Sequence, residues 1–170
     1  MKSISVELLD DKSLKHFQLI QGLVKYLKEG MKVLAAYDGS ENAKRAVAEA
    51  AELAKQFSGS LTVLHVYWDP SESAYAGELG RTEGIEVRDE ASLRVLDDIE
   101  PMLKEAGVDY EFRSEVDPNP PKAIMRIAEN EGYDCISMGS RGRGGARAWL
   151  LGSVSSMVIA ESNCPVVVVK

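Results

Sequence analysis

The sequence has no glycine–lysine pair, only two cysteines, and no apolar run long enough for a membrane-spanning helix. A Walker A phosphate loop, which ends in Gly-Lys-Ser or Gly-Lys-Thr, is therefore excluded. Cys135 and Cys164 match neither a CxxC motif nor a zinc-ligand spacing, and we interpret them as buried thiols. The N-terminal residues 1–13 are too acidic and too interrupted for a signal peptide. Together these absences predict a soluble cytoplasmic protein.

Positive charge is also scarce, because Lys and Arg number 20 against 27 Asp and Glu, giving a net charge of −7. This balance argues against nonspecific nucleic-acid binding, which needs clustered cations. Carboxylates are absent from Cys135 to Ala160, where the charged residues are Arg141, Arg143 and Arg147. The same window contains a glycine-rich loop that precedes a possible helix start. Glycine allows close backbone approach to a ligand, and free N–H groups at a helix start attract phosphate. The window therefore predicts an anion site.

Apolar strand patterns alternate with helical patterns along most of the chain. The expected strands are residues 31–37, 61–68, 108–116, 133–138 and 165–169. This alternation predicts an α/β fold with an open five-stranded parallel sheet in the order 3-2-1-4-5 and helices on both faces. In such a Rossmann-like sheet, ligands bind beyond the carboxyl ends of the strands. The loops there begin at Asp38, Val66 and Gly139.

Some local expectations are more specific. Ser40 is expected to cap the first helix, and Gly152-Ser153 to begin the last one, with Val154, Met157 and Val158 facing inward. A long helix is expected between residues 85 and 107, with a kink or break near Pro101 and its end at Gly107. Strict alternation in residues 108–116 predicts a half-exposed strand at a sheet edge.

Residues 1–29 differ from the rest and form an expected helical extension to a single domain at residues 30–170. Leu14, Phe17, Ile20, Leu23 and Leu27 recur at helical spacing. Two interpretations stay open. The helix packs on its own domain, or it docks on a second subunit or another, unknown protein.

The glycine-rich loop fits no dinucleotide fingerprint, since Arg147 stands at the last glycine position of a GxGxxG pattern that starts at Gly142. The spacing that is present is G-x2-G-x9-G-S, formed by Gly139, Gly142, Gly152 and Ser153. In order along the chain stand VLAAYDGS, LHV, MGSRGRGG, LLGSVS and NCPVVVVK. With these linked pieces, residues 31–170 resemble the universal stress protein family in its ATP-binding form.

The resemblance implies an adenine nucleotide alpha hydrolase-like fold and an ATP site. Gly139 and Gly142 would lie along the ribose and phosphates. The remaining expected contacts are Ala36, Asp38, Val66 and Met138 around the nucleoside, and Gly152, Ser153, Val154 and Ser155 at the triphosphate. From charge alone, Arg141, Arg143 and Arg147 are candidates to neutralise the phosphates. Asp38 either contacts the nucleoside, holds Mg2+ or Mn2+ through water, or caps a helix.

The leading functional hypothesis is a regulatory ATP-binding protein of the stress response, with AMP or ADP as alternative ligands. It would act as a homodimer through its C-terminal strand, without nucleic-acid or membrane partners. A slow ATP hydrolase and a nucleotide-free dimerisation module are the alternatives. No residue pair stands out as a poised base and nucleophile, so no catalytic residue is predicted. His65 lacks partner ligands for a metal and is interpreted as structural.

Overall fold

The computed structural model describes residues 28–68, 85–87, 94–142 and 151–170. The predicted N-terminal helix, Arg143 and Arg147 lie outside the described residues. Within the described part of the chain, no helix is both long enough and apolar enough to cross a membrane.

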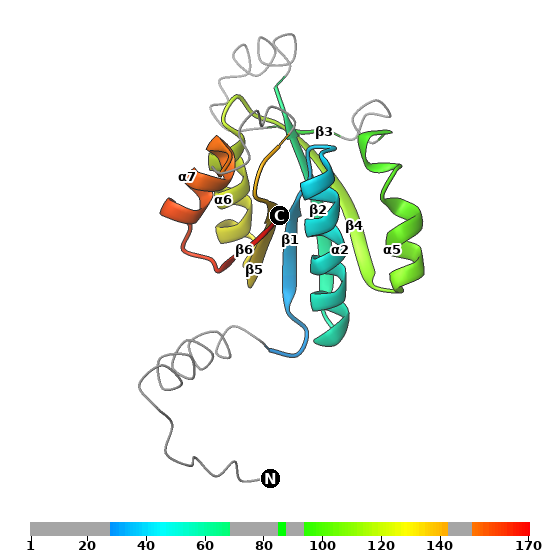
Figure 1. Ribbon diagram of the computed structural model, residues 1–170. Coiled ribbons are helices and arrows are strands. Elements are labelled where there is room, and N and C mark those ends of the chain that lie inside the picture. Colours follow the sequence, from blue (N-terminus) through cyan, green and yellow to red (C-terminus); the bar gives the residue numbers. More distant parts are fainter. Residues whose placement is uncertain (1–27, 69–84, 88–93, 143–150) are drawn as a thin grey trace, which may run out of the picture.

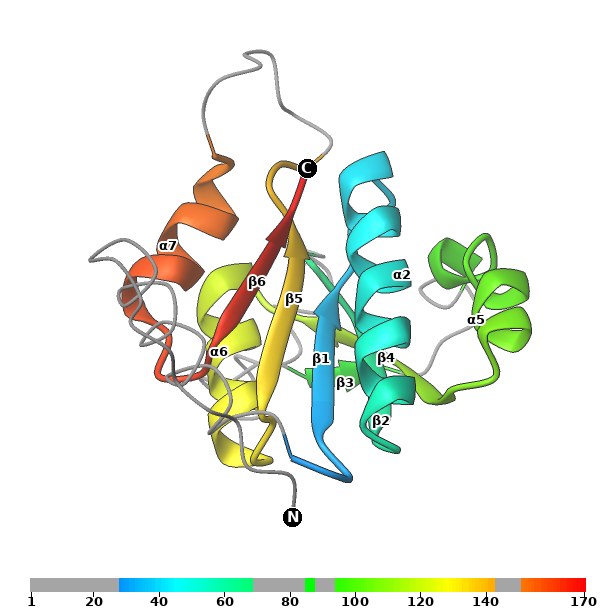
Figure 2. The ribbon, with the colours of Figure 1, turned by 60° about the horizontal axis from the view of Figure 1, so that its bottom comes forward.

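A twisted sheet forms the centre of the molecule (Figure 1). The described strands are β1 (Lys32–Ala36), β2 (Ser60–Tyr67), β3 (Ile85–Val87), β4 (Asp109–Val116), β5 (Cys135–Gly139) and β6 (Val166–Val169), in the order β3-β4-β2-β1-β5-β6. All neighbours are parallel except β3 and β4. The five parallel strands therefore confirm the predicted order 3-2-1-4-5, and β6 lies beside β5 at one edge (Figure 2).

Strand β3 was not predicted, and it corrects two expectations. Residues 85–87 pair antiparallel with Ser114–Val116 of β4, so β4 is covered there and is not a free edge along its whole length. The expected long helix is wrong over its first part, which contains β3 and a 3-10 turn at Arg94–Leu96. The α-helix of this region, α5 (Glu100–Ala106), begins beside Pro101 and ends at Gly107, whose φ is +66°. Pro101 therefore starts this helix rather than kinking it, because proline is tolerated in the first turn.

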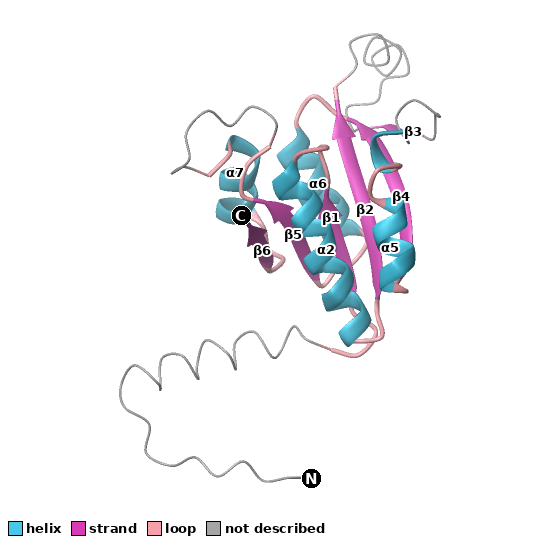
Figure 3. Cartoon of the chain, turned by 45° about the vertical axis from the view of Figure 1, so that its right-hand side comes forward, coloured by secondary structure: helices cyan, strands magenta, loops and turns pink. Residues whose placement is uncertain are grey.

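Helices cover both faces of the sheet, as predicted (Figure 3). Helices α2 (Glu41–Gln56) and α5 pack on one face, and α6 (Pro120–Asn130) and α7 (Ser153–Glu161) pack on the other. Alternate strand residues serve the two layers, because successive side chains of a strand point to opposite faces. We call the core between the sheet and helices α2 and α5 the α2 layer, and the core between the sheet and helices α6 and α7 the α6 layer. On β1, Val33 lies in the α2 layer and Leu34 lies in the α6 layer.

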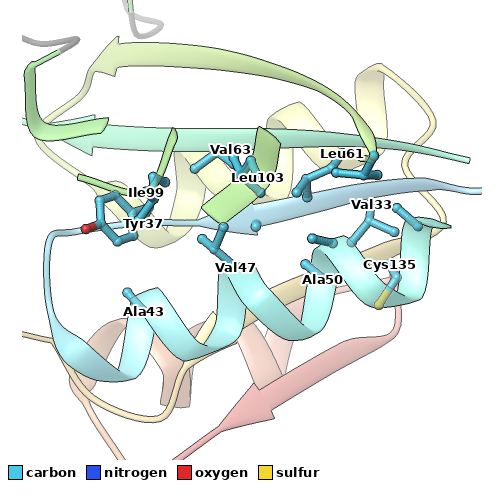
Figure 4. Packing of buried hydrophobic residues seen from close by; sticks show 14 of the residues in the cluster. Val33, Tyr37, Ala43, Val47, Ala50, Leu61, Val63, Ile99, Leu103 and Cys135 are labelled. Atoms are coloured by element: carbon cyan, nitrogen blue, oxygen red, sulfur yellow. The ribbon is translucent and has the colours of Figure 1, made fainter. Parts of the chain in front are cut away.

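The α2 layer contains the larger core cluster, in which small helix residues sit close to the strands (Figure 4). Ala50 of α2 lies on the side of Val33, while Leu103 and Val63 lie close to one another towards α5 (Figure 4). Alanines bring α2 near enough to β5 for the Ser137 hydroxyl to donate to the carbonyl oxygen of Ala46 at 2.9 Å. As predicted, the Ser40 hydroxyl caps α2 by accepting from the Ala43 amide at 3.2 Å.

Helix α7 begins after Gly152, as expected, but one of its predicted core residues is exposed. Val158 is buried and Val154 packs partly against the core. Met157, in contrast, is 38% exposed, and so are Ile159 at 44% and Leu151 at 45%. Helix α7 is apolar around most of its circumference, so its sequence does not identify the buried face.

Candidate functional site

Asp38 stands immediately beyond β1, at the carboxyl edge of the sheet. Its Oδ1 accepts a hydrogen bond from the Ser40 amide at 3.0 Å. This bond fixes the turn between β1 and α2, while the side chain of Ser40 itself caps the helix. Asp38 thus supports the capping turn, and its Oδ2 faces the loop that follows β5, as the surroundings of Gly142 show.

At two glycines of the motif a side chain would collide with a neighbouring residue. A Cβ added at Gly142 would lie 2.2 Å from Oδ2 of Asp38, and one added at Gly139 would lie 2.8 Å from the Ala43 nitrogen. Gly139 therefore allows β5 to end against the first turn of α2, where the obstacle is backbone. Gly142 brings the loop backbone against the carboxylate of Asp38. Packing within the protein is therefore sufficient to explain why glycine stands at both positions.

Ser140, which the sequence analysis did not single out, holds the loop together and is 3% exposed. Its amide donates to the Val169 carbonyl oxygen at 2.7 Å. Its own carbonyl oxygen accepts from the Gly152 amide at 2.8 Å and lies 2.9 Å from the hydroxyl of Ser155. These bonds join the end of β5 to β6 and to the start of α7. Its position between two motif glycines could have drawn attention to Ser140. However, Ser140 makes most of these hydrogen bonds through its backbone, and a pattern of side chains in the sequence does not reveal such bonds.

The predicted triphosphate residues divide into two kinds. Ser155 is 2% exposed, and its hydroxyl lies 2.9 Å from the carbonyl oxygen of Ser140 and 3.0 Å from that of Gly152. Ser153 is exposed at the first turn of α7, and Val154 is half-buried against the core. Gly152 is the N-cap residue, and no side chain caps the helix. The first backbone N–H groups of a helix suit an anion.

An apolar wall adjoins this loop. Ala36 and Val66, near the carboxyl ends of β1 and β2, pack partly against the α6 layer, and Met138 of β5 is buried in it. The three residues stand near the carboxyl ends of the adjacent strands β2, β1 and β5. Arg141 is half-buried, and its carbonyl oxygen accepts from the hydroxyl of Ser40 at 3.4 Å. The structure thus brings the described members of the predicted set to one end of the sheet.

His65 and Tyr37 lie on the other side of β1 and β2, in the α2 layer. Nδ1 of His65 is 2.8 Å from the carbonyl oxygen of Tyr37, and its ring stacks on Tyr67 with centroids 5.5 Å apart. The Tyr37 hydroxyl donates to the Asp98 carboxylate at 2.7 Å. Burial, and then this bond, raise the pKa of Tyr37 well above its ordinary value. Among the described residues, no group of three or more His, Cys, Asp or Glu side chains is placed to hold a metal ion.

The universal stress protein family model matches residues 31–170. A universal stress protein of Thermus aquaticus is 37% identical over 138 residues, which cover 81% of this chain and 97% of that protein. The universal stress protein YxiE of Bacillus subtilis is 33% identical over 146 residues, covering 82% and 98%.

Solved structures agree with the sequence relatives. The structure of MJ0577, a universal stress protein of Methanocaldococcus jannaschii, has a TM-score of 0.64 at 32% identity and covers 83% of this chain and 96% of its own. A universal stress protein solved in complex with cAMP has a TM-score of 0.59 at 25% identity and covers 82% and 96%. With the matching strand order and the glycine loop at the carboxyl edge of the sheet, these likenesses establish that this chain belongs to the universal stress protein family.

Proposed function

We propose that this protein binds an adenine nucleotide, ATP in the first instance, at the carboxyl ends of β1, β2 and β5, and acts as a regulatory nucleotide-binding dimer in the stress response. The nucleoside would lie against Ala36, Val66 and Met138. The phosphates would follow the backbone of Gly139 to Gly142 and meet the start of α7. AMP and ADP are alternative ligands of the same site.

The observation that carries this proposal is the closeness of the loop backbone, the start of α7 and Asp38. The Gly152 amide bonds the loop at Ser140, so the first turn of α7 lies next to the glycines. The first turn of α7, whose N–H groups no side chain caps, and the half-buried Arg141 provide positive potential in a chain of net charge −7. The intact G-x2-G-x9-G-S spacing and the relative solved with cAMP support an adenine nucleotide as the ligand.

Asp38 is the carboxylate best placed to meet a Mg2+ or Mn2+ ion that accompanies the nucleotide. A single carboxylate suits Mg2+, which keeps several waters and takes most of its other ligands from phosphate. Its Oδ1 accepts from the Ser40 amide at 3.0 Å, and its Oδ2 lies on the side of Gly142, towards the loop where the phosphates would lie.

Calorimetric titration of the full chain with ATP tests the site. Gly142→Val should abolish binding, because the new side chain displaces Asp38 and blocks approach of the phosphates to the loop. Ser156→Val, which adds the same side chain at an exposed position of α7, is the matched control and should bind like the parent. Thermal unfolding of both variants shows whether the fold is kept. Unchanged ATP affinity in a folded Gly142→Val protein would remove the loop from the site.

A further inference from the structure

A hollow lies at the opposite end of the sheet from the glycine loop, and we name it the α6–α7 groove. It has a volume of about 310 Å³. Its apolar lining includes Met125 and Ala128 of α6, Tyr133 before β5, and Cys164 and Pro165 before β6. Tyr133 and Ala128 are buried, and Cys164 lies 3.4 Å from the carbonyl oxygen of Tyr133 through its sulfur. The groove is thus a partly apolar hollow beside the amino ends of β5 and β6.

The rim of the groove is acidic. Glu129, Asp134 and Glu161 contribute carboxylates, and the lining residues include no Lys or Arg. One Oε of Glu129 accepts from the side-chain amide of Asn163 at 3.3 Å. Two cations lie near the rim, Lys28 and Lys32; the Lys32 ammonium donates to the carbonyl oxygen of Glu131 and lies 4.6 Å from the centre of the Tyr133 ring. The surplus of carboxylates favours a cationic occupant with apolar side chains.

The described chain starts at this rim. Nζ of Lys28 lies 2.8 Å from Oδ1 of Asp134, while Oδ2 of Asp134 accepts from the Lys32 amide at 2.9 Å. Asp134 therefore holds the chain beside the groove at residue 28. Whatever precedes Lys28 is tethered there, and a tether of a few residues gives a local concentration in the millimolar range.

The sequence that precedes Lys28 has the complementary chemistry. From Lys12 to Lys28 there are four lysines and no carboxylate, within a chain of net charge −7. The apolar residues at helical spacing end with Leu23, Val24 and Leu27, close to the tether. In a helix, Leu23 would stand about 7.5 Å along the axis from Lys28, so these side chains are within reach of a hollow that Asp134 borders.

We propose that residues 14–27 dock within the same chain onto the α6–α7 groove, with Leu23, Val24 and Leu27 in the apolar hollow and the lysines at the acidic rim. A basic amphipathic helix also suits an anionic membrane surface. We favour docking within the chain because the apolar hollow, its acidic rim and the attachment of the chain at Lys28 lie at the same end of the sheet. The docked segment covers the end of the sheet away from the glycine loop and leaves the proposed nucleotide site open.

The native thiol of Cys164 permits a direct test in the full chain. Leu23→Cys, oxidised at low protein concentration with copper phenanthroline, should form an intramolecular disulfide with Cys164, identified by peptide mass. Gln21→Cys is the matched control, since 3.6 residues per turn place it on the opposite side of a helix from residue 23. We expect a several-fold higher yield from position 23. In the Leu23→Cys background, Glu161→Lys should lower the yield, and Glu105→Lys, an exposed change on α5, should not.

Hydrogen exchange of the unmodified chain provides a second measurement that does not depend on thiol reactivity. Residues 14–27 should be protected, and Leu23→Glu should remove the protection while Gln18→Glu leaves it. Equal cross-linking from positions 21 and 23, or a disulfide that joins two copies, would overturn docking within one chain. Absence of both cross-link and protection would also overturn it. Binding to phosphatidylglycerol vesicles at the expense of the cross-link would assign the segment to membranes instead.

Discussion

Gly142 and Ser155, which the family resemblance assigns to a nucleotide site, both have close neighbours within the protein itself. A side chain at Gly142 would have to displace the carboxylate of Asp38, and Ser155 is buried with its hydroxyl next to the carbonyl oxygen of Ser140. The family resemblance placed both residues at the phosphates. The structure adds that each also shapes the loop, so their substitution affects the loop itself as well as any contact with the nucleotide.

Ser155→Ala should lower the free energy of unfolding by about 1 kcal/mol, because a buried hydrogen bond to the loop carbonyl is lost. Ser153→Ala should leave stability nearly unchanged, since Ser153 is exposed. Urea unfolding of the two variants beside the parent makes the comparison. Equal losses for the two serines would contradict the role assigned to Ser155.

Cys135 gives a pH dependence whose sign follows from its burial. Desolvation raises the pKa of this thiol from 9.0 to about 11. The unfolded chain therefore loses this proton at lower pH than the folded chain, so the contribution is intact below pH 9.0 and is lost as pH rises towards about 11. Each such proton changes the slope of stability against pH by at most about 1.4 kcal/mol per unit. Cys135→Ala should flatten this slope in urea unfolding above pH 9.0, and an unchanged slope would refute the assignment.

Helices and strands were predicted correctly where the hydrophobic spacing of a segment agrees with the contacts that the segment makes in the fold. The start of helix α2 was predicted from its cap at Ser40, and one alanine-rich stripe of the helix faces a sheet buried on both sides. The helix expected over residues 85–107 is wrong in its first part, because apolar residues at helical spacing do not reveal that Ile85–Val87 pairs with β4, while its last part is helix α5. The expectation that Met157 faces the core is wrong for a related reason, because α7 also carries apolar residues on its exposed side.

The close packing of the α2–β2 connection predicts how substitutions of its glycine change the stability of the fold. A Cβ at Gly59 would lie 2.0 Å from the carbonyl oxygen of Met31, whereas one at Gly132 would meet nothing within 4 Å. Gly59→Ala should therefore destabilise the protein by about 3 kcal/mol, through displacement of backbone. Gly132→Ala, at a φ of +68°, should cost about 1 kcal/mol from its left-handed conformation alone. Thermal unfolding ranks the two, and the reverse ranking would contradict this packing.

For the whole molecule, the strand order and the placement of the glycine loop were predictable because alternation limits the possible topologies. The α6–α7 groove was not predictable from the sequence, because the helix ends that line it are far apart in the chain. The C-terminal strand β6 lies at a sheet edge, as the predicted order 3-2-1-4-5 implies, and the unpredicted β3 forms the other edge. Val167 is 39% exposed there, and Val168 packs partly against the core. An apolar edge strand favours pairing with a second copy.

If β6 strands pair across a two-fold axis, Val167→Lys should shift the protein from dimer to monomer in light scattering. Val168→Lys should also weaken the dimer, but it will destabilise the fold because its side chain reaches the α6 layer. Glu52→Lys, an exposed change on α2, is the control for added positive charge. A parent protein that is monomeric, or a dimer that both valine variants leave intact, would remove the edge-pairing proposal.

The central claim, an adenine nucleotide at the carboxyl edge of the sheet, is tested most directly by an NMR titration of the isotope-labelled full chain with ATP. The largest amide shifts should occur at Asp38–Ser40, Gly139–Gly142 and Gly152–Ser155, with small changes around Cys164. Added salt should weaken the binding, because screening acts over about 8–10 Å on the charge of Arg141. Saturating ATP that leaves these amides unchanged, or that shifts the α6–α7 groove instead, would contradict the account.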